Sequence, residues 1–203
     1  MAKGSGGTRG GRASSRGIMS SRASQLAEQY LGAVSDAVLK KELAEGLADF
    51  EKEFGLPENL TIKLGDIGVG GKINGLNRLY LNSGYENGMM NKAEAKKTFI
   101  HELAHGIDKT ETHFLRNISG TIEKNGTVKG VLKPENKVFE KKLTAAYKHF
   151  KLNYNSKSAK EIGKYALKSK HEFFAESLSA YMTGTKNKYS AFAYNLAKSM
   201  SGK

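Results

Sequence analysis

Cysteine is absent from this chain of 203 residues. Disulfides and cysteine-based zinc sites are therefore excluded, and any metal site must use histidine and carboxylate side chains. No apolar run approaches about eighteen residues, so we expect no membrane-spanning helix. The chain also has no apolar segment near its start of the kind that marks an ordinary secretory signal. These absences predict synthesis in a cytoplasm and no membrane partner.

Acidic residues are scarce in two segments. Residues 1–23 hold five basic residues and no acid, and residues 141–170 hold nine lysines and one acid, Glu161. Together these segments account for the whole net charge of +13. They are either solvated basic surfaces or contact surfaces for nucleic acid or an acidic partner. Tyr147, Phe150 and Tyr154 are spaced as the core face of a helix rather than as stacking platforms for bases.

The first residues, "MAKGSGGTRGGRASSRGIMSS", are Gly, Ser and Arg with almost nothing to bury. This composition predicts a disordered basic tail over 1–23, followed by a single domain over 24–203. Hydrophobic spacing predicts helices over 24–54, 91–109, 134–151, 171–182 and 188–200, the first with a break near 35–36. Strands are expected over 60–67 and 78–83, with turn residues over 68–77 and a hairpin around Asn125–Gly126. The predicted fold class is α+β, mainly helical, with a small sheet.

The segment "TFIHELAHGID", residues 98–108, places two histidines four residues apart on a largely apolar helix. His101 and His105 therefore share one helix face, at a separation that suits a single Zn²⁺. Glu102 projects beside them, where it can take a proton from a water that zinc acidifies. This HExxH pattern predicts a metal-dependent hydrolase. The alternative is a histidine pair on the surface or satisfied in the core.

A catalytic zinc needs a third protein ligand. The HExxHxxGxxH pattern fails here, because Asp108 stands at the glycine position and Glu111 at the third histidine position. We predict Glu172 as third ligand, with Glu176 one turn later accepting the N–H of His101. The alternative for this pair is an exposed acidic face.

Asp108, one turn after His105, either orients that histidine or stabilises the helix end. Two histidines and a carboxylate could also hold iron, but the adjacent Glu102 favours hydrolysis.

"HELAHGID" and "YALKSKHEFFAES" together resemble the gluzincin-type metallopeptidase domains, a group that includes the catalytic domain of anthrax lethal factor and the Pro-Pro endopeptidases. The resemblance covers these two segments and implies a zincin-like fold, with His101, His105 and Glu172 as zinc ligands and Glu102 as general base. It also implies that Tyr165, seven residues before the ligand glutamate, supports the oxyanion. The residues alone do not distinguish Tyr165 from the other tyrosines or from a packed side chain.

The resemblance further implies an edge strand that binds an extended peptide. We assign that strand to "RLYLNS", residues 78–83, with Tyr80 and Asn82 as substrate-binding residues; an ordinary sheet strand is the alternative. The opening residues resemble the starts of phage-encoded proteins, which implies a domain carried in a phage particle or acting in the host.

Two functions follow from these observations. The first is a zinc-dependent endopeptidase that acts on a protein or peptide. The second is a basic protein, phage virion-associated or nucleic-acid-binding, that uses the same fold as a scaffold.

Overall fold

The computed structural model describes residues 21–57, 59–73, 78–108, 118–122, 128–132 and 134–201. Residues 1–20 of the predicted basic tail and the predicted Asn125–Gly126 turn lie outside the described residues. The described residues are mainly helical and include a small sheet, which confirms the α+β class.

The N-terminal helical segment is two helices, as the expected break requires. α1 spans Arg22–Leu31 and α2 spans Ala37–Phe54. Asp36 caps α2, because its side chain accepts a hydrogen bond of 2.8 Å from the backbone N–H of Leu39. The buried face of α2 includes Leu39 and Leu43, whereas Val38 is exposed. α2 therefore turns the face with Leu39 and Leu43, and not the one with Val38, toward the core.

Three short strands form the main sheet in the order β1–β3–β2. β1 (Thr61–Gly65) runs parallel to β3 (Arg78–Asn82), and β2 (Gly71–Ile73) runs antiparallel to β3. The prediction that 68–77 is only turn material is wrong, since β2 lies inside it. The prediction that residues 78–83 form an edge strand is also wrong: β3 is the central strand and β2 occupies the edge.

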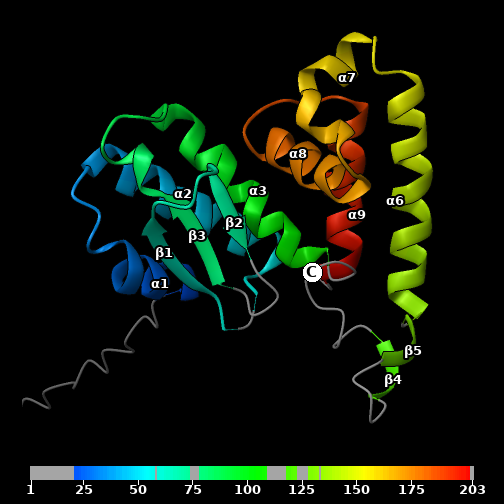
Figure 1. Ribbon diagram of the computed structural model, residues 1–203, viewed down its shortest axis with the longest axis horizontal. Helices are drawn as coiled ribbons and strands as arrows, with labels where there is room; N and C mark the ends of the chain where they lie inside the picture. The colour runs from blue at the N-terminus through cyan, green and yellow to red at the C-terminus, as the bar shows by residue number, and fades with distance from the viewer. Residues whose placement is uncertain are drawn as a thin grey trace, which may run out of the picture.

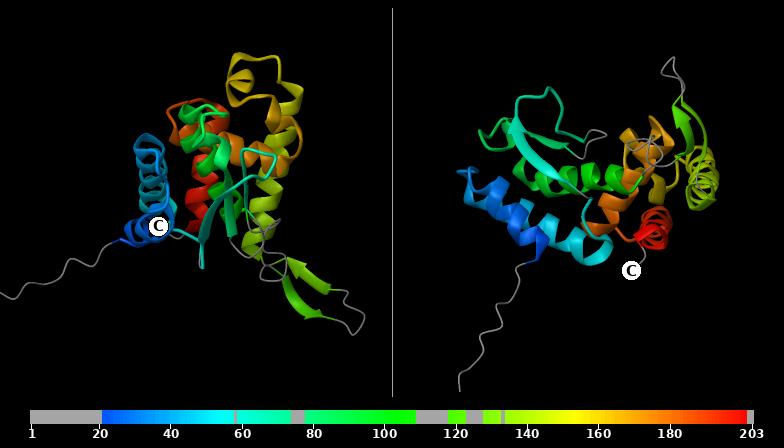
Figure 2. Two further views of the ribbon diagram at one scale, coloured as in Figure 1. Left: turned by 60° about the vertical axis from the view of Figure 1, so that its left-hand side comes forward. Right: turned by 90° about the horizontal axis from the view of Figure 1, so that it is seen from below.

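After β3 come two short 3-10 turns, η1 (Ser83–Tyr85) and η2 (Lys92–Glu94). The helix α3 (Ala95–Ile107) follows them. An antiparallel hairpin then pairs β4 (Ile118–Ile122) with β5 (Val128–Leu132), as predicted. In Figures 1 and 2 this hairpin projects near the base of α6, away from the main sheet. α6 (Pro134–Leu152) begins at Pro134, as expected for a proline at the first helical position.

The C-terminal half is helical. It contains α7 (Lys157–Ile162), the 3-10 turn η3 (Lys164–Leu167), α8 (Lys170–Met182) and α9 (Lys188–Ser201). Figure 1 shows the main sheet and α1–α3 together in one half of the molecule and α6–α9 in the other half, with α3 extending toward α8.

One cluster of buried apolar side chains includes residues from α1 through α9. Its aromatic part joins α6, α8 and α9, because the rings of Phe150 and Phe173 lie 4.7 Å apart and Tyr189 packs on both. Phe150 is fully buried, and Tyr147 and Tyr154 pack against the cluster, as the spacing predicted. None of the described helices is both long and apolar enough to cross a membrane.

Candidate metal centre and active site

The two histidines of the HExxH segment lie on the middle of α3. Phe99, Ile100 and Leu103 are fully buried and fix the rotation of this helix in the core. The i, i+4 spacing then directs His101 and His105 to the same side, where α8 packs against α3. Both imidazoles are 8 % exposed, so they are core side chains with one open edge rather than a surface pair.

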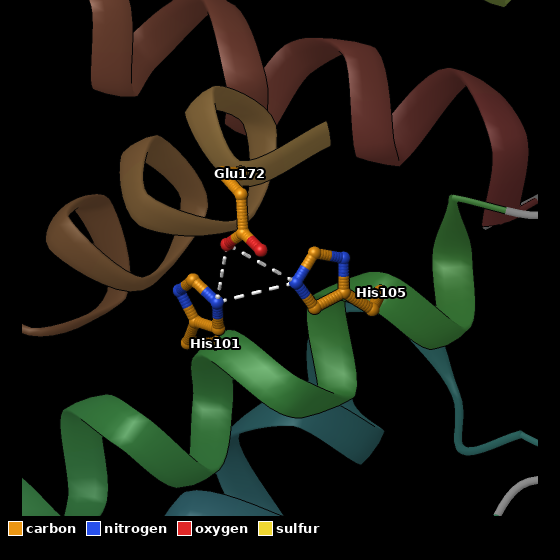
Figure 3. Close-up of side chains that lie close together, drawn as sticks. All are labelled: His101, His105 and Glu172. Atoms are coloured by element: carbon orange, nitrogen blue, oxygen red, sulfur yellow. Dashed lines mark hydrogen bonds and ion pairs between the residues drawn. The ribbon is translucent and has the colours of Figure 1, made fainter. Parts of the chain in front are cut away.

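The two histidines and Glu172 direct their polar atoms toward one another (Figure 3). The Nε2 atoms of His101 and His105 are 3.2 Å apart. Glu172 Oε2, which reaches in from the first turn of α8, lies 3.0 Å from the first Nε2 and 3.5 Å from the second. Ser169 fixes that turn, because its hydroxyl oxygen accepts the backbone N–H of Glu172 at 3.1 Å. Three potential metal ligands thus converge on one point.

These separations fit a tetrahedral metal site. Ligand atoms about 2.0–2.1 Å from a zinc ion at tetrahedral angles lie about 3.3–3.4 Å from one another, and the three observed separations bracket that value. Glu172 Oε2 is buried and makes no hydrogen bond of good geometry within the described residues. A buried carboxylate oxygen without such a partner is what a metal ligand looks like before the metal is added. The residues present therefore fit Zn²⁺.

Without metal, a proton on His101 connects the same groups. Burial alone would lower the pKa of His101, but the carboxylates of Glu172 and Glu176 outweigh it and raise that pKa to about 9. Burial would raise the pKa of Glu172, but the neighbouring side chains of His101 and His105 outweigh it and lower that pKa to about 2. The metal-free site is therefore an ion pair whose proton a metal ion has to displace.

Glu176 lies one turn after Glu172 and contacts the other nitrogen of His101. Its Oε1 is 3.2 Å from His101 Nδ1, and its Oε2 is 3.4 Å from Lys97 Nζ. Burial would raise the pKa of Glu176, but His101 and Lys97 lower it, so the carboxylate is ionised. A carboxylate on Nδ1 holds the imidazole in the orientation and tautomer that present Nε2 to a metal.

Glu102 lines the cleft beside His101 and contacts the edge strand β2. It is 8 % exposed, and burial raises its pKa even though the backbone N–H of Ile73 donates a hydrogen bond to its carboxylate. β2 passes so close that a Cβ added to Gly71 would lie 2.8 Å from Glu102 Cγ. Glycine at this position gives the carboxylate its space. A raised pKa makes Glu102 a better proton acceptor than an exposed glutamate.

A cleft of about 340 Å³ joins Glu102 and His101 to Tyr165. Tyr165 belongs to η3, which Gly163 begins with a positive φ of 107°, a conformation that favours glycine. The Tyr165 ring is 45 % exposed, and its centroid is 6.0 Å from that of His101. Tyr165 therefore lies at the mouth of the site, with its ring edge-on to that of His101. Its role in stabilising an oxyanion stays a prediction.

Asp108 lies at the end of α3 and is fully buried. Its carboxylate pairs with Nδ1 of His171 at 2.5 Å. This pair ties the end of α3 to the residue before Glu172, so Asp108 helps to place the third ligand. Sequence reasoning missed His171, and no signal in the sequence connects it with Asp108, because only the packing of α3 on α8 brings the two together.

Tyr80 and Asn82 do not line the cleft that contains Glu102 and Tyr165. Both belong to the central strand β3, and Tyr80 pairs with a residue of each neighbouring strand. Asn82 instead supports the loop beside the site, since its Nδ2 donates to the carbonyl of Val69 at 2.8 Å. The assignment of these two residues as an edge-strand contact for substrate is therefore wrong. Gly70 and Gly71, at and just before the start of β2, line the cleft instead.

Most lysines of residues 141–170 are exposed on α6, α7 and η3. Lys170 differs, because it forms an ion pair with Glu140.

The sequence was also compared with models of protein families and with curated proteins, and the fold with solved structures. None of these comparisons finds a match.

Proposed function

We propose that this chain is a zinc-dependent endopeptidase with a zincin-like fold of the gluzincin type. One observation carries the proposal. The His101–His105–Glu172 group and the buried carboxylate of Glu102 lie side by side, with Glu102 and His101 both facing one cleft. Burying a carboxylate costs free energy. A site that only held a metal would have no need for a buried glutamate beside its ligands. Bound zinc would supply Lewis acidity for a water and a peptide carbonyl.

The chain's own residues account for the remaining steps. Glu102 would accept the proton of the attacking water and deliver it to the leaving amine, a role that its buried, β2-supported carboxylate suits. Tyr165, across the cleft, would donate its phenolic O–H to the developing oxyanion. Glu176 would keep Nε2 of His101 directed to the metal. The exposed edge of β2 would align an extended peptide by main-chain hydrogen bonds.

The test has two stages. First, elemental mass spectrometry should find one zinc per purified chain, with the zinc lost or weakened in His101→Ala and Glu172→Ala and kept in Glu28→Gln, an exposed control on α1. Iron in place of zinc would favour oxygenase chemistry instead.

Second, the zinc-loaded chain should hydrolyse an unstructured peptide library, and Glu102→Gln should lower kcat by about 10²–10⁴-fold at unchanged zinc content. Full activity in Glu102→Gln would contradict the mechanism.

A second function rests on the exposed lysines of α6, α7 and η3. Several such cations on adjacent helices could neutralise the phosphates of a nucleic acid. Binding of this kind should weaken steeply as salt rises, because phosphate contacts release counterions. A flat response of DNA or RNA binding between low and moderate salt would exclude it.

A further inference from the structure

The charged groups of the cleft differ in whether the protein itself neutralises them. Lys97 pairs with Glu176, which also contacts His101, so this lysine and this glutamate satisfy each other. Lys168 also lines the cleft, but no carboxylate of the described residues lies within ion-pair distance of its ammonium group. Among the described residues, the cleft therefore presents one cation that no carboxylate neutralises.

Lys168 is held in a defined place despite its exposure. Its Nζ lies 3.8 Å from the centroid of the Tyr165 ring, a distance at which a cation is attracted to the face of an aromatic ring. The backbone supports the same arrangement, because the N–H of Lys168 donates to the carbonyl of Tyr165 at 3.0 Å. Tyr147 fixes the turn from behind, since its hydroxyl donates to the carbonyl of Leu167 at 2.6 Å. The ammonium group is thus a preorganised feature of the cleft mouth.

This cation lies within reach of a peptide in the site. The Tyr165 ring is 6.0 Å from the His101 ring, so Lys168 Nζ is no farther from His101 than that distance and the 3.8 Å together. An extended peptide advances about 3.3 Å per residue, so the separation corresponds to about three residues. We propose that Lys168 selects substrates with a carboxylate within about three residues of the scissile bond. This inference rests on the proposed peptidase function.

A carboxylate in the same cleft sharpens the selection. Glu94 also lines the cleft and precedes His101 by seven residues, about 10 Å along the helix axis at 1.5 Å per residue. A substrate carboxylate next to Glu94 would meet a like charge, whereas one next to Lys168 would meet an opposite charge. The acidic group should therefore be favoured next to Lys168 and disfavoured next to Glu94. An acidic side chain and a free C-terminal carboxylate both satisfy this chemistry.

The experiment compares fluorogenic peptides with the zinc-loaded full chain. One neutral parent peptide is made with a single Asp at each of the three positions on either side of the cleaved bond, and each peptide is made with a free and an amidated C-terminus. For the favoured Asp position, kcat/KM should exceed that of the neutral parent by up to about five-fold, the contribution of an exposed ion pair. A preference that persists after amidation assigns the side chain, and one that amidation abolishes assigns the terminal carboxylate.

Variants then test whether Lys168 is responsible. Lys168→Met should bring the ratio of acidic to neutral kcat/KM to one, and Lys168→Glu should invert it. Lys164→Met is the matched control: it removes the same charge from the same turn outside the cleft, and its ratio should stay that of the wild type.

If the ratio of acidic to neutral kcat/KM is the same in wild type and Lys168→Glu, and the neutral peptide is still cleaved, the role of Lys168 is overturned. The peptidase function would survive that result. Failure of the zinc-loaded wild type to cleave any peptide would overturn the peptidase function and this inference with it.

Discussion

Removing the metal should make the stability of this protein fall as pH rises above neutral. In the metal-free chain, burial opposes a proton on His101, but Glu172 and Glu176 raise its pKa from 6.5 to about 9. The folded state thus holds a proton more tightly than the unfolded chain does. The resulting stabilisation is complete below pH 6.5 and is lost as pH rises through about 9. At about 1.4 kcal/mol per pH unit, the displacement corresponds to about 3 kcal/mol.

Urea unfolding of the chelator-treated protein at pH 6.5 and at about pH 9.5 measures this difference. A loss of about 3 kcal/mol corresponds to a midpoint about 1–3 M lower at the higher pH, for the urea dependence usual in small proteins. Glu172 does not contribute in this window, because its pKa of about 2 leaves it ionised throughout. His101→Gln should flatten the response.

Zinc should reverse the sign of the same response. A metal binds the neutral imidazole, so raising the pH removes a competing proton and strengthens binding. The zinc-loaded protein should therefore gain stability over the range in which the metal-free protein loses it. The reasoning is refuted if metal-free wild type is as stable at the higher pH as at pH 6.5, or if His101→Gln shows the wild-type slope.

Three further substitutions test the supports of the site. Gly71→Ala places a Cβ 2.8 Å from Glu102 Cγ, so peptide hydrolysis should fall about tenfold or more at unchanged zinc content, while Gly65→Ala, which meets nothing within 4 Å, should be silent. Ser169→Ala removes the cap on the backbone N–H of Glu172 and should lower the free energy of unfolding by about 1 kcal/mol; a stability unchanged in urea would show that the cap is dispensable. Phe173→Ala opens a cavity between α6, α8 and α9 and should cost about 3–5 kcal/mol, seen as a lower thermal midpoint, and a midpoint equal to wild type would contradict the described core.

Local sequence signals predicted the described α-helices well except the short α7, because each of the longer helices carries its own apolar spacing. The break before α2 was visible as Asp36, a residue type that caps helices, and Pro134 marked the start of α6. The i, i+4 spacing of His101 and His105 placed both on one helix face without further information. Glu172 was found because a catalytic zinc needs a third ligand and because of the resemblance to known metallopeptidases, and the packing of α8 on α3 brings it to the histidines.

The features that depend on pairing between distant segments were not predictable in the same way. β2 is three residues long within a glycine-rich stretch, so it has too few side chains to show alternation. The position of β3 in the middle of the sheet is set by its partners on both sides, and its own sequence is equally suitable for an edge. The contact between Asp108 and His171 likewise depends on the crossing of two helices.

The order of the two site helices along the chain bears on how the protein is made. α3 leaves the ribosome first, and the hairpin, α6, α7 and η3 follow before α8 supplies Glu172 and Glu176. During this interval the nascent chain holds two histidines and Glu102 but no third ligand. Under the proposed peptidase function, the site would be incomplete until α8 is made, so neither the unfinished chain nor its neighbours on the polysome would be exposed to a working site.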